Sequence, residues 1–222
     1  ENAQELINSI KLLEKEVFSR ALKISEKRKF SANKMALQIE EVLANLGMAG
    51  SKFAVSITQK ESSDLMQKCG PRGMDNVEFL ISANPGEPLK PLAKIASGGE
   101  LSRIMLAIKT ILADADKIST LIFDEIDTGI SGKAAKSVAV KLKTIAEKHQ
   151  VICVTHHAQI AAAADNNIYI SKEFADNTTV TSVKNLNEIE KIKEVSRLLD
   201  GDSESEITAV HAKELIAKFR SN

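Results

Sequence analysis

ASGGELSR, residues 96–103, and LIFDEID, residues 121–127, decide how this 222-residue chain folds. The residues between them predict a helix, because apolar side chains recur there at helical spacing. They are Leu101, Ile104, Met105, Ile108, Ile111 and Leu112. A small-residue turn, a helix and an apolar strand closed by carboxylates together form a layout typical of nucleotide sites. Because no G-x-x-x-x-G-K-S/T phosphate loop occurs anywhere in the sequence, the pattern indicates half of an ATPase.

Composition and charge set broad limits on what the chain can be. With 43% hydrophobic residues, it can bury a core large enough for one domain and an appendage. Its formal net charge is zero, so any nucleic-acid surface has to be local. Two cysteines give no disulfide framework and fit a reducing cytosol. No apolar run approaches the ~18 residues of a membrane span and no signal peptide is recognisable, so we expect no membrane partner.

Residues 1–46 predict a long helix, because no Gly or Pro occurs before Gly47. A heptad-like apolar stripe follows it: Leu6, Ile10, Leu13, Val17, Ala21 and Ile24, then Met35, Ile39, Val42 and Leu46. Two interpretations stay open, namely an amphipathic helix pair packed on the domain and the base of a coiled-coil arm. A basic cluster here is either a solvated helix face or a phosphate-contacting patch. It consists of Lys23, Lys27, Arg28, Lys29 and Lys34.

The segment that follows predicts an antiparallel strand pair. Residues 52–58 and 76–82 alternate apolar and polar side chains, and a Gly-Pro-Arg-Gly turn at 70–73 lies between them. The run Asn-Pro-Gly-Glu-Pro at 84–88 breaks regular structure, and Pro91 predicts an irregular chain as far as Ile95.

The rest of the chain predicts an α/β lobe built on a parallel sheet with flanking helices. Continuous apolar strands at 120–123 and 151–154 flank a helix at 131–149, which indicates a right-handed βαβ unit with both faces covered. We expect a short helix at 158–164, a third strand at 167–171, an edge strand at 178–183 and two C-terminal helices. We therefore divide the chain into a helical segment, residues 1–46, and the α/β lobe, residues 47–222. Because the sequence begins with Glu1 rather than Met, we expect a fragment or a processed chain.

The helix start at residues 97–100 is the first candidate for chemistry. Ser97 and Glu100 have the S-x-x-E spacing of a capping box, which stabilises a helix by about 1 kcal/mol. Capping does not explain two consecutive glycines, because each costs up to about 1 kcal/mol relative to alanine. Glycines let a phosphate approach the backbone amides at the positive end of a helix. We therefore expect this helix start to bind nucleotide phosphate through Ser97, Gly98, Gly99 and Glu100.

Two carboxylates, Asp124 and Glu125, directly follow the apolar strand. In an open parallel sheet, ligands bind beyond the carboxyl ends of the strands. Asp124 can hold Mg²⁺ there, usually through water. Glu125 can orient and deprotonate an attacking water, a role that accelerates a reaction about 10²–10⁴-fold. The alternative is an exposed acidic strand end or a cap for the following turn.

His156 follows the second strand as the two carboxylates follow the first. We therefore expect it at the same edge of the sheet, facing the same crevice. A lone histidine is more often structural, but this position favours a contact with a γ-phosphate. His157 points elsewhere if the chain stays extended.

The segment DTGISGKA, residues 127–134, superficially resembles a phosphate loop. Asp127 stands where the first glycine belongs, and Ala134 stands where the Mg²⁺-binding hydroxyl belongs. The segment also follows the acidic strand rather than an independent one. It is therefore not a Walker A motif.

These motifs resemble those of the ABC ATPases. Residues 97–100 are similar to the ABC signature, residues 121–125 to a Walker B strand with its catalytic Glu, Asp127 to the D-loop and His156 to the H-loop. The helical arm and the missing Walker A resemble the SMC-like group, in which a coiled coil splits the ATPase into two lobes. Four longer strings resemble the RecN family of bacterial DNA repair proteins: NPGEPLKPL, ASGGELSR, DEIDTGISG and CVTH. One departure is His157, where we expect a leucine.

The resemblance implies an ATP hydrolase that uses Mg²⁺ and acts on DNA in double-strand break repair and recombination, in the bacterial cytoplasm at the nucleoid. In such proteins two heads enclose two nucleotides. The signature residues would contact the γ-phosphate bound to the opposite head, whereas Asp124, Glu125 and His156 would act on the nucleotide of their own head. The implied partners are the N-terminal Walker A lobe of the same protein, a second head and DNA. This chain alone would be inactive.

Two other functions are weighed against this one. An ABC transporter nucleotide-binding subunit would normally carry Walker A and a Q-loop ahead of the signature, where this chain has charged helix and a Pro-rich loop. A non-catalytic lobe that dimerises or holds DNA is the second alternative. The intact Asp124 and Glu125 argue against such a degenerate site.

Overall fold

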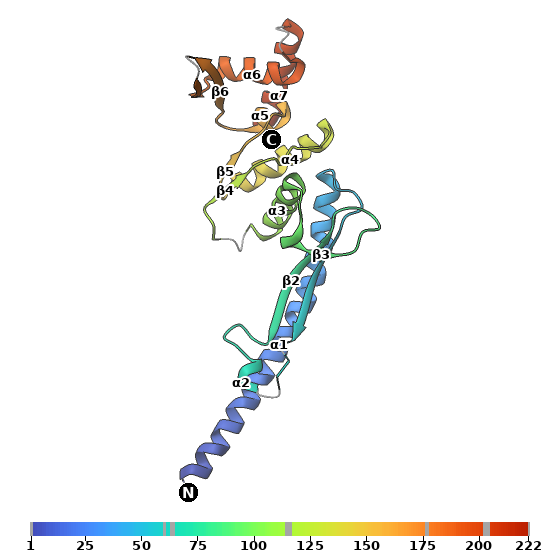
Figure 1. Ribbon diagram of the computed structural model, residues 1–222, viewed down its shortest axis with the longest axis vertical. Coiled ribbons are helices and arrows are strands. Elements are labelled where there is room, and N and C mark those ends of the chain that lie inside the picture. The colour runs from blue at the N-terminus through green and yellow to red at the C-terminus, as the bar shows by residue number, and fades with distance from the viewer. Residues whose placement is uncertain are drawn as a thin grey trace. The chain divides into compact units, whose positions relative to one another are not determined.

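The computed structural model describes residues 2–59, 61–62, 65–113, 117–175, 178–201 and 205–221. The chain divides into two compact units. The first unit comprises residues 1–44 and 48–96, and the second comprises residues 45–47 and 97–222. Figure 1 labels most of the elements of the two units.

A single helix, α1 (Asn2–Asn45), dominates the first unit (Figure 1). It ends where Gly47 adopts a left-handed φ of 82° and the Met48 amide donates to the Leu43 carbonyl oxygen (3.0 Å), as in many glycine-terminated helices. Its buried residues begin only at Ala21, whereas the first part of the predicted stripe is exposed: Leu6, Ile10, Leu13 and Val17. The predicted long helix is confirmed as one continuous helix rather than a pair.

The predicted antiparallel strand pair is also confirmed. Strand β1 (Lys52–Gln59) pairs along its whole length with β2 (Asp75–Ser82). The short helix α2 (Leu65–Lys68) and a turn closed by mutual hydrogen bonds between Gly70 and Gly73 lie between them. The irregular chain expected up to Ile95 is wrong in part, because β3 (Lys90–Pro91) pairs with β2, and a 3₁₀ turn, η1 (Leu92–Lys94), follows. β3 is an edge strand, where a proline without an amide hydrogen is tolerated.

Buried polar contacts fasten the hairpin to α1. The Asp75 side chain, which is 0% exposed, accepts hydrogen bonds from the Ser25 hydroxyl (2.7 Å) and the Arg28 guanidinium (2.9 Å). Burial raises the pKa of Asp75, but the bonds from Ser25 and Arg28 and the nearby charges of Arg28 and Lys29 outweigh it, so the net pKa is lowered. Glu40 accepts hydrogen bonds from the first two residues of β1. The hairpin is therefore held against the second half of α1.

The second unit is built around two parallel strands, β4 (Thr120–Phe123) and β5 (Gln150–Cys153). Helix α3 (Gly98–Leu112) precedes β4, and α4 (Gly132–Ala146) connects it to β5. The two helices contact each other through their apolar faces, which carry the buried side chains Ile104, Leu106, Ala107, Ile108, Ala135, Val138, Ala139 and Leu142. The predicted strand–helix–strand order is confirmed.

The expectation that both faces of this sheet are covered is wrong. Leu121 and Phe123 are buried on one face, but Ile122 on the other face is 70% exposed and Ile152 is 47% exposed. The expected third strand, β6 (Ile168–Ala175), instead forms a separate antiparallel hairpin with β7 (Thr178–Asn185). Among the described residues, the parallel sheet therefore has two strands and one bare face.

Three further helices complete the second unit. They are α5 (Ala158–Ala163), α6 (Glu188–Asp200) and α7 (Glu206–Arg220), and they contact one another. Asn187 and Glu190 form a reciprocal capping box at the start of α6. No helix in the described part of the chain is both long and apolar enough to span a membrane.

Candidate functional site

The start of α3, the loop after β4 and the end of β5 meet in the second unit, and together they carry the predicted site residues. Ser97 caps α3, because its hydroxyl accepts a hydrogen bond from the Glu100 amide (3.4 Å). This is one half of the predicted capping box. Gly98 is the first helical residue and is exposed, whereas Gly99 is buried.

The two glycines differ in what surrounds them. A Cβ on Gly99 would lie 3.0 Å from the Glu125 carbonyl oxygen and 3.2 Å from the Thr128 Cβ. Close packing of the loop on the helix therefore explains Gly99 without any phosphate. A Cβ on Gly98 would meet only the flexible carboxylate of Glu125, at 2.2 Å from Oε2. The Glu125 side chain thus occupies the space over Gly98 in this conformation.

Glu125 has an unusual backbone. Its φ of 55° lies in the left-handed region, which is uncommon for residues other than glycine. Its carbonyl oxygen accepts a hydrogen bond from the Thr128 amide (3.0 Å), which closes a tight turn. This turn places the predicted base against the positive end of α3.

Asp124 is exposed at the end of β4, and its Oδ1 accepts a hydrogen bond from the Glu125 amide (2.9 Å). The described residues contain no group of three or more His, Cys, Asp or Glu side chains that could hold a metal ion. Mg²⁺ nevertheless commonly binds through one or two carboxylates and takes its other ligands from water and substrate phosphates. Asp124 fits that mode of binding.

The Cys153 thiol lies near the carboxylates at this edge of the sheet, and they affect its pKa. Burial, followed by the charges of Asp127 and Asp124, raises its pKa to about 12. The same field favours a divalent cation at the strand ends.

Asp127 lies 2% exposed beneath the site. Its Oδ2 accepts hydrogen bonds from the Thr155 hydroxyl (2.5 Å) and the His156 amide (2.9 Å), and it lies 3.4 Å from His156 Nδ1. This carboxylate therefore ties the loop after β4 to the end of β5. The structure thus brings His156 to the same edge as the two carboxylates, as the strand order predicts.

The two neighbouring histidines have different surroundings. The His156 side chain is 72% exposed, and its Nδ1 lies beside the Asp127 carboxylate. His157 is half-buried at the start of α5, where its Nδ1 lies 3.2 Å from the Gln159 side-chain oxygen. Of the two, His156 is the more exposed and the one that lies beside Asp127.

Ser102 and Arg103 are not among the sequence-predicted site residues, yet both contact the acidic loop. The Ser102 hydroxyl donates to the Asp124 carbonyl oxygen (2.6 Å). The buried Arg103 guanidinium donates to the carbonyl oxygens of Ile126 (3.3 Å) and Thr128 (2.9 Å). Burial lowers the pKa of Arg103. Arg103 lies outside the predicted apolar stripe of the helix, so the sequence pattern does not mark it as a buried residue.

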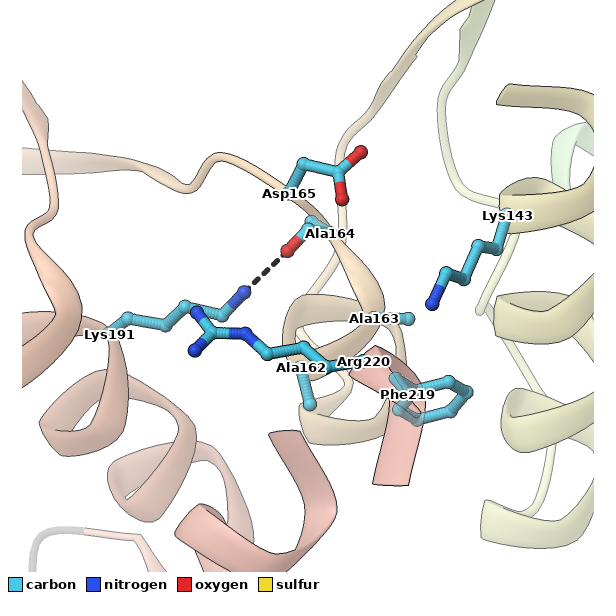
Figure 2. Close-up of a pocket in the computed structure, with 8 residues that line it drawn as sticks. All are labelled: Lys143, Ala162, Ala163, Ala164, Asp165, Lys191, Phe219 and Arg220. Atoms are coloured by element: carbon cyan, nitrogen blue, oxygen red, sulfur yellow. Dashed lines mark hydrogen bonds between the residues drawn. The ribbon is translucent and has the colours of Figure 1, made fainter. Parts of the chain in front are cut away.

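A separate pocket of about 250 Å³ lies among α4, α5, α6 and α7 (Figure 2). Its charged lining residues are Lys143, Asp165, Lys191 and Arg220. Lys191 is buried, and its ammonium donates to the Ala164 carbonyl oxygen at the end of α5 (Figure 2). Burial and then the charge of Arg220 lower the pKa of Lys191. None of the lining residues is a predicted site residue. Lys191 instead satisfies a main-chain carbonyl at the C-terminal end of α5.

The chain is similar to known proteins over most of its length. A scan of protein-family models finds none that matches it. The DNA repair protein RecN of Treponema pallidum (strain Nichols) is 48% identical over 193 residues, which cover 87% of this chain and 34% of the relative. RecN of Bacillus subtilis (strain 168) is 41% identical over 222 residues, which cover 96% of this chain and 38% of the relative. The chain is a homologue of RecN.

The match concerns the C-terminal portion of RecN, and the chain spans slightly more than a third of the length of these relatives. Among solved structures, the Smc head domain with a coiled coil and joint from Pyrococcus yayanosii is 23% identical, with a TM-score of 0.50. That match covers 88% of this chain and 33% of the Smc chain. It bears on the fold alone, and it confirms a long helix followed by an α/β lobe of the SMC-head type.

Proposed function

We propose that this chain is the C-terminal lobe of an ATPase head, which hydrolyses ATP only together with a lobe that carries the phosphate loop. The observation that carries the proposal is the contact between the start of α3 and the acidic loop after β4, in a sequence without a phosphate loop. The identity to RecN supports the same conclusion, because those relatives are named DNA repair proteins.

The exposed side chains of the site serve the nucleotide bound to their own head. Glu125 acts as the base that orients and deprotonates the attacking water. His156 contacts the γ-phosphate through Nε2, while Asp127 holds its other ring nitrogen. Asp124 would hold Mg²⁺, and the ion would offset negative charge on the phosphates.

The start of α3 serves the nucleotide of a second, identical head. Ser97, Gly98, Gly99 and Glu100 present the helix start to a γ-phosphate. The Glu125 carboxylate that now lies against Gly98 leaves when a phosphate arrives, because two anions cannot share that position. Asp127, the D-loop residue, contributes to the nucleotide site through the loop that it anchors.

The bare face and the open edges of the β4–β5 sheet favour a lobe partner. A parallel sheet is normally covered on both faces. Among the described residues, the outer edges of β4 and β5 also pair with no further strand. The N-terminal lobe of the same protein would supply the missing strands and the phosphate loop. Helix α1 would be the base of the coiled-coil arm, and ATP-driven closure of two heads would be coupled through such arms to DNA.

A complementation experiment tests this function. The purified chain alone should show no ATP turnover, because it lacks the lysine-bearing phosphate loop. Mixing it with the separately expressed N-terminal lobe should restore turnover that DNA stimulates. Glu125→Gln, which keeps the size of the side chain, should lower kcat in the mixture by about 10²–10⁴-fold and leave ATP binding in place.

Two outcomes would overturn the proposal. ATP turnover by the chain alone, abolished by Glu125→Gln, would show that the site is complete without a second lobe. A stable complex of the two lobes without ATP turnover would indicate a non-catalytic module instead.

A further inference from the structure

We infer that Ser102 and Arg103 are positioning residues, which lock the loop at residues 124–128 to α3 so that a nucleotide contact at the helix start is transmitted to the catalytic carboxylates. The inference rests on the proposed function and deepens it. Neither side chain needs to touch a nucleotide, because both act on the backbone of the loop.

The contacts come from one face of α3. Gly98, Gly99, Ser102 and Arg103 follow a spacing of three to four residues, which places side chains on the same side of a helix. The glycines let the loop approach the helix backbone. One turn later, the Ser102 hydroxyl and the Arg103 guanidinium donate hydrogen bonds to the loop.

These donors satisfy alternate carbonyl groups of the loop, those of Asp124, Ile126 and Thr128, at 2.6, 3.3 and 2.9 Å. The loop lies outside the β4–β5 ladder, so its carbonyls have no strand partner. A buried carbonyl without a partner is costly, and side-chain donors are one way to satisfy it. These contacts with α3 add to the hydrogen bond within the turn and to the bonds of Asp127, and they hold the loop against the helix.

A purely structural role accounts poorly for Arg103. Its Nε is buried without a hydrogen-bond partner among the described residues. A buried guanidinium pays a desolvation cost that an apolar side chain of similar length would avoid. Its use here is explained if the guanidinium, whose Nη1 donates to two carbonyls at once, sets the position of the loop.

The mechanical consequence follows from the bond pattern. Any shift of α3 that accompanies phosphate binding at Gly98 pulls three carbonyls of the loop that carries Asp124 and Glu125. A displacement of about 1 Å at a reacting group can change a rate by about 10²-fold. Arg103 and Ser102 would therefore make hydrolysis in one site depend on occupation of the other.

The test uses the full-length protein with both lobes and measures kcat and KM for ATP together with the thermal unfolding midpoint. Arg103→Met should lower kcat by about 10²-fold and change KM by less than about threefold, because ground-state binding comes from the phosphate loop. Ser102→Ala should lower kcat by about tenfold, since it removes one of the three bonds. Arg103→Lys should fall between Arg103→Met and wild type, because an ammonium keeps the charge and the donors but lacks the fixed plane and the reach of the guanidinium.

Thr110→Val is the matched control. Thr110 also lies on α3, but its hydroxyl donates to the Leu106 carbonyl oxygen (2.8 Å) of its own helix rather than to the loop. The control should keep kcat within about twofold of wild type, although it also removes a hydroxyl bond to a main-chain carbonyl.

The outcomes separate this inference from the proposed function. An inactive wild-type protein would overturn the proposed function. An active wild type whose kcat survives both Arg103→Met and Ser102→Ala would overturn only the inference. A loss of activity that merely follows the unfolded fraction, or that the Thr110→Val control shares, would also overturn it. If Arg103→Met does not fold, Ser102→Ala decides.

Discussion

Gly98 and Gly99 are adjacent residues with different reasons for being glycine. Gly99 faces the main chain of the acidic loop, so its lack of a side chain is needed for packing. Gly98 is exposed and faces the end of a flexible side chain, so packing does not require it. If phosphate binding is the reason for Gly98, substitution there should damage function while leaving the fold intact.

Gly98→Ala should therefore change the free energy of unfolding by less than about 1 kcal/mol, because the Glu125 carboxylate can turn aside and alanine favours the helix. It should lower ATP turnover of the two-lobe protein about 10²-fold, because the methyl group blocks the approach to the amides. Gly99→Ala should destabilise the chain by about 1–3 kcal/mol through overpacking. Urea unfolding and steady-state turnover measure the two effects, and a fully active Gly98→Ala protein would refute the phosphate role.

Among the elements, the hairpin of the first unit is attached to the long helix by the buried carboxylate of Asp75 as well as by Glu40. The predicted pattern of α1 shows where it is apolar, but Asp75 fixes where the hairpin attaches. Because the folded pKa of Asp75 is below its ordinary value of 3.8, the unfolded chain binds more protons in this range. The stabilisation is thus complete above the unfolded pKa and is lost as the pH falls through the folded pKa.

Asp75→Asn should destabilise the first unit by about 1–3 kcal/mol at pH 7, because it leaves Arg28 without its charged partner. It should also remove the loss of stability that protonation of Asp75 causes when the pH falls below the pKa of Asp75 in the unfolded chain. Hydrogen exchange of the hairpin amides in the whole chain, from pH 7 to pH 3, measures both effects. Glu78→Gln is the control, since this exposed residue lies on the same strand. Equal effects of the two substitutions would refute the anchoring role.

For the molecule as a whole, the two-stranded sheet is an incomplete structure. Its bare face carries Ile122 and Ile152, although parallel strands are normally buried on both sides. Another strand can pair with the open edge of such a sheet through main-chain hydrogen bonds. The same surface makes the isolated chain prone to self-association.

Ile122→Lys should leave the stability of the isolated chain within about 0.5 kcal/mol of wild type, because the side chain is already exposed there. It should abolish binding of the N-terminal lobe, because a lysine would have to be buried in the joint sheet. Ile189→Lys is the matched control, since Ile189 is also 70% exposed but lies on α6. Titration calorimetry with the N-terminal lobe should distinguish the two variants, and unchanged binding by Ile122→Lys would exclude this face as the lobe interface.

Most helices and strands could be predicted from the sequence, but the elements that cover the faces of the β4–β5 sheet could not. Apolar periodicity and Gly or Pro breaks predict α1, α3, β4 and β5, because these signals act within a few residues. A continuous apolar run indicates a strand made for burial on two sides, but it does not tell which part of the protein provides the cover. The strand expected at residues 167–171 therefore does not join β4 and β5, since β6 pairs with β7 instead.

The site shows the same division. Strand order alone places His156 beside the acidic loop, because parallel strands end at one edge. The contacts of Arg103 could not be predicted, because its partners are main-chain carbonyls, which any residue carries. The burial of Asp127 could not be predicted for a related reason, since its partners are a hydroxyl and an amide in the segment after β5, which lies far along the sequence.

The left-handed backbone of Glu125 has a consequence for the timing of the proposed reaction. A residue other than glycine in that region costs of the order of 1–3 kcal/mol. The lobe meets this cost when it folds, before any nucleotide is present. The turn that aims the carboxylate is thus formed before ATP arrives, so a shift of α3 moves this turn as a unit and Glu125 needs only a side-chain rotation within it. Side-chain rotations of exposed residues take picoseconds to nanoseconds, so readiness of the base would not limit turnover.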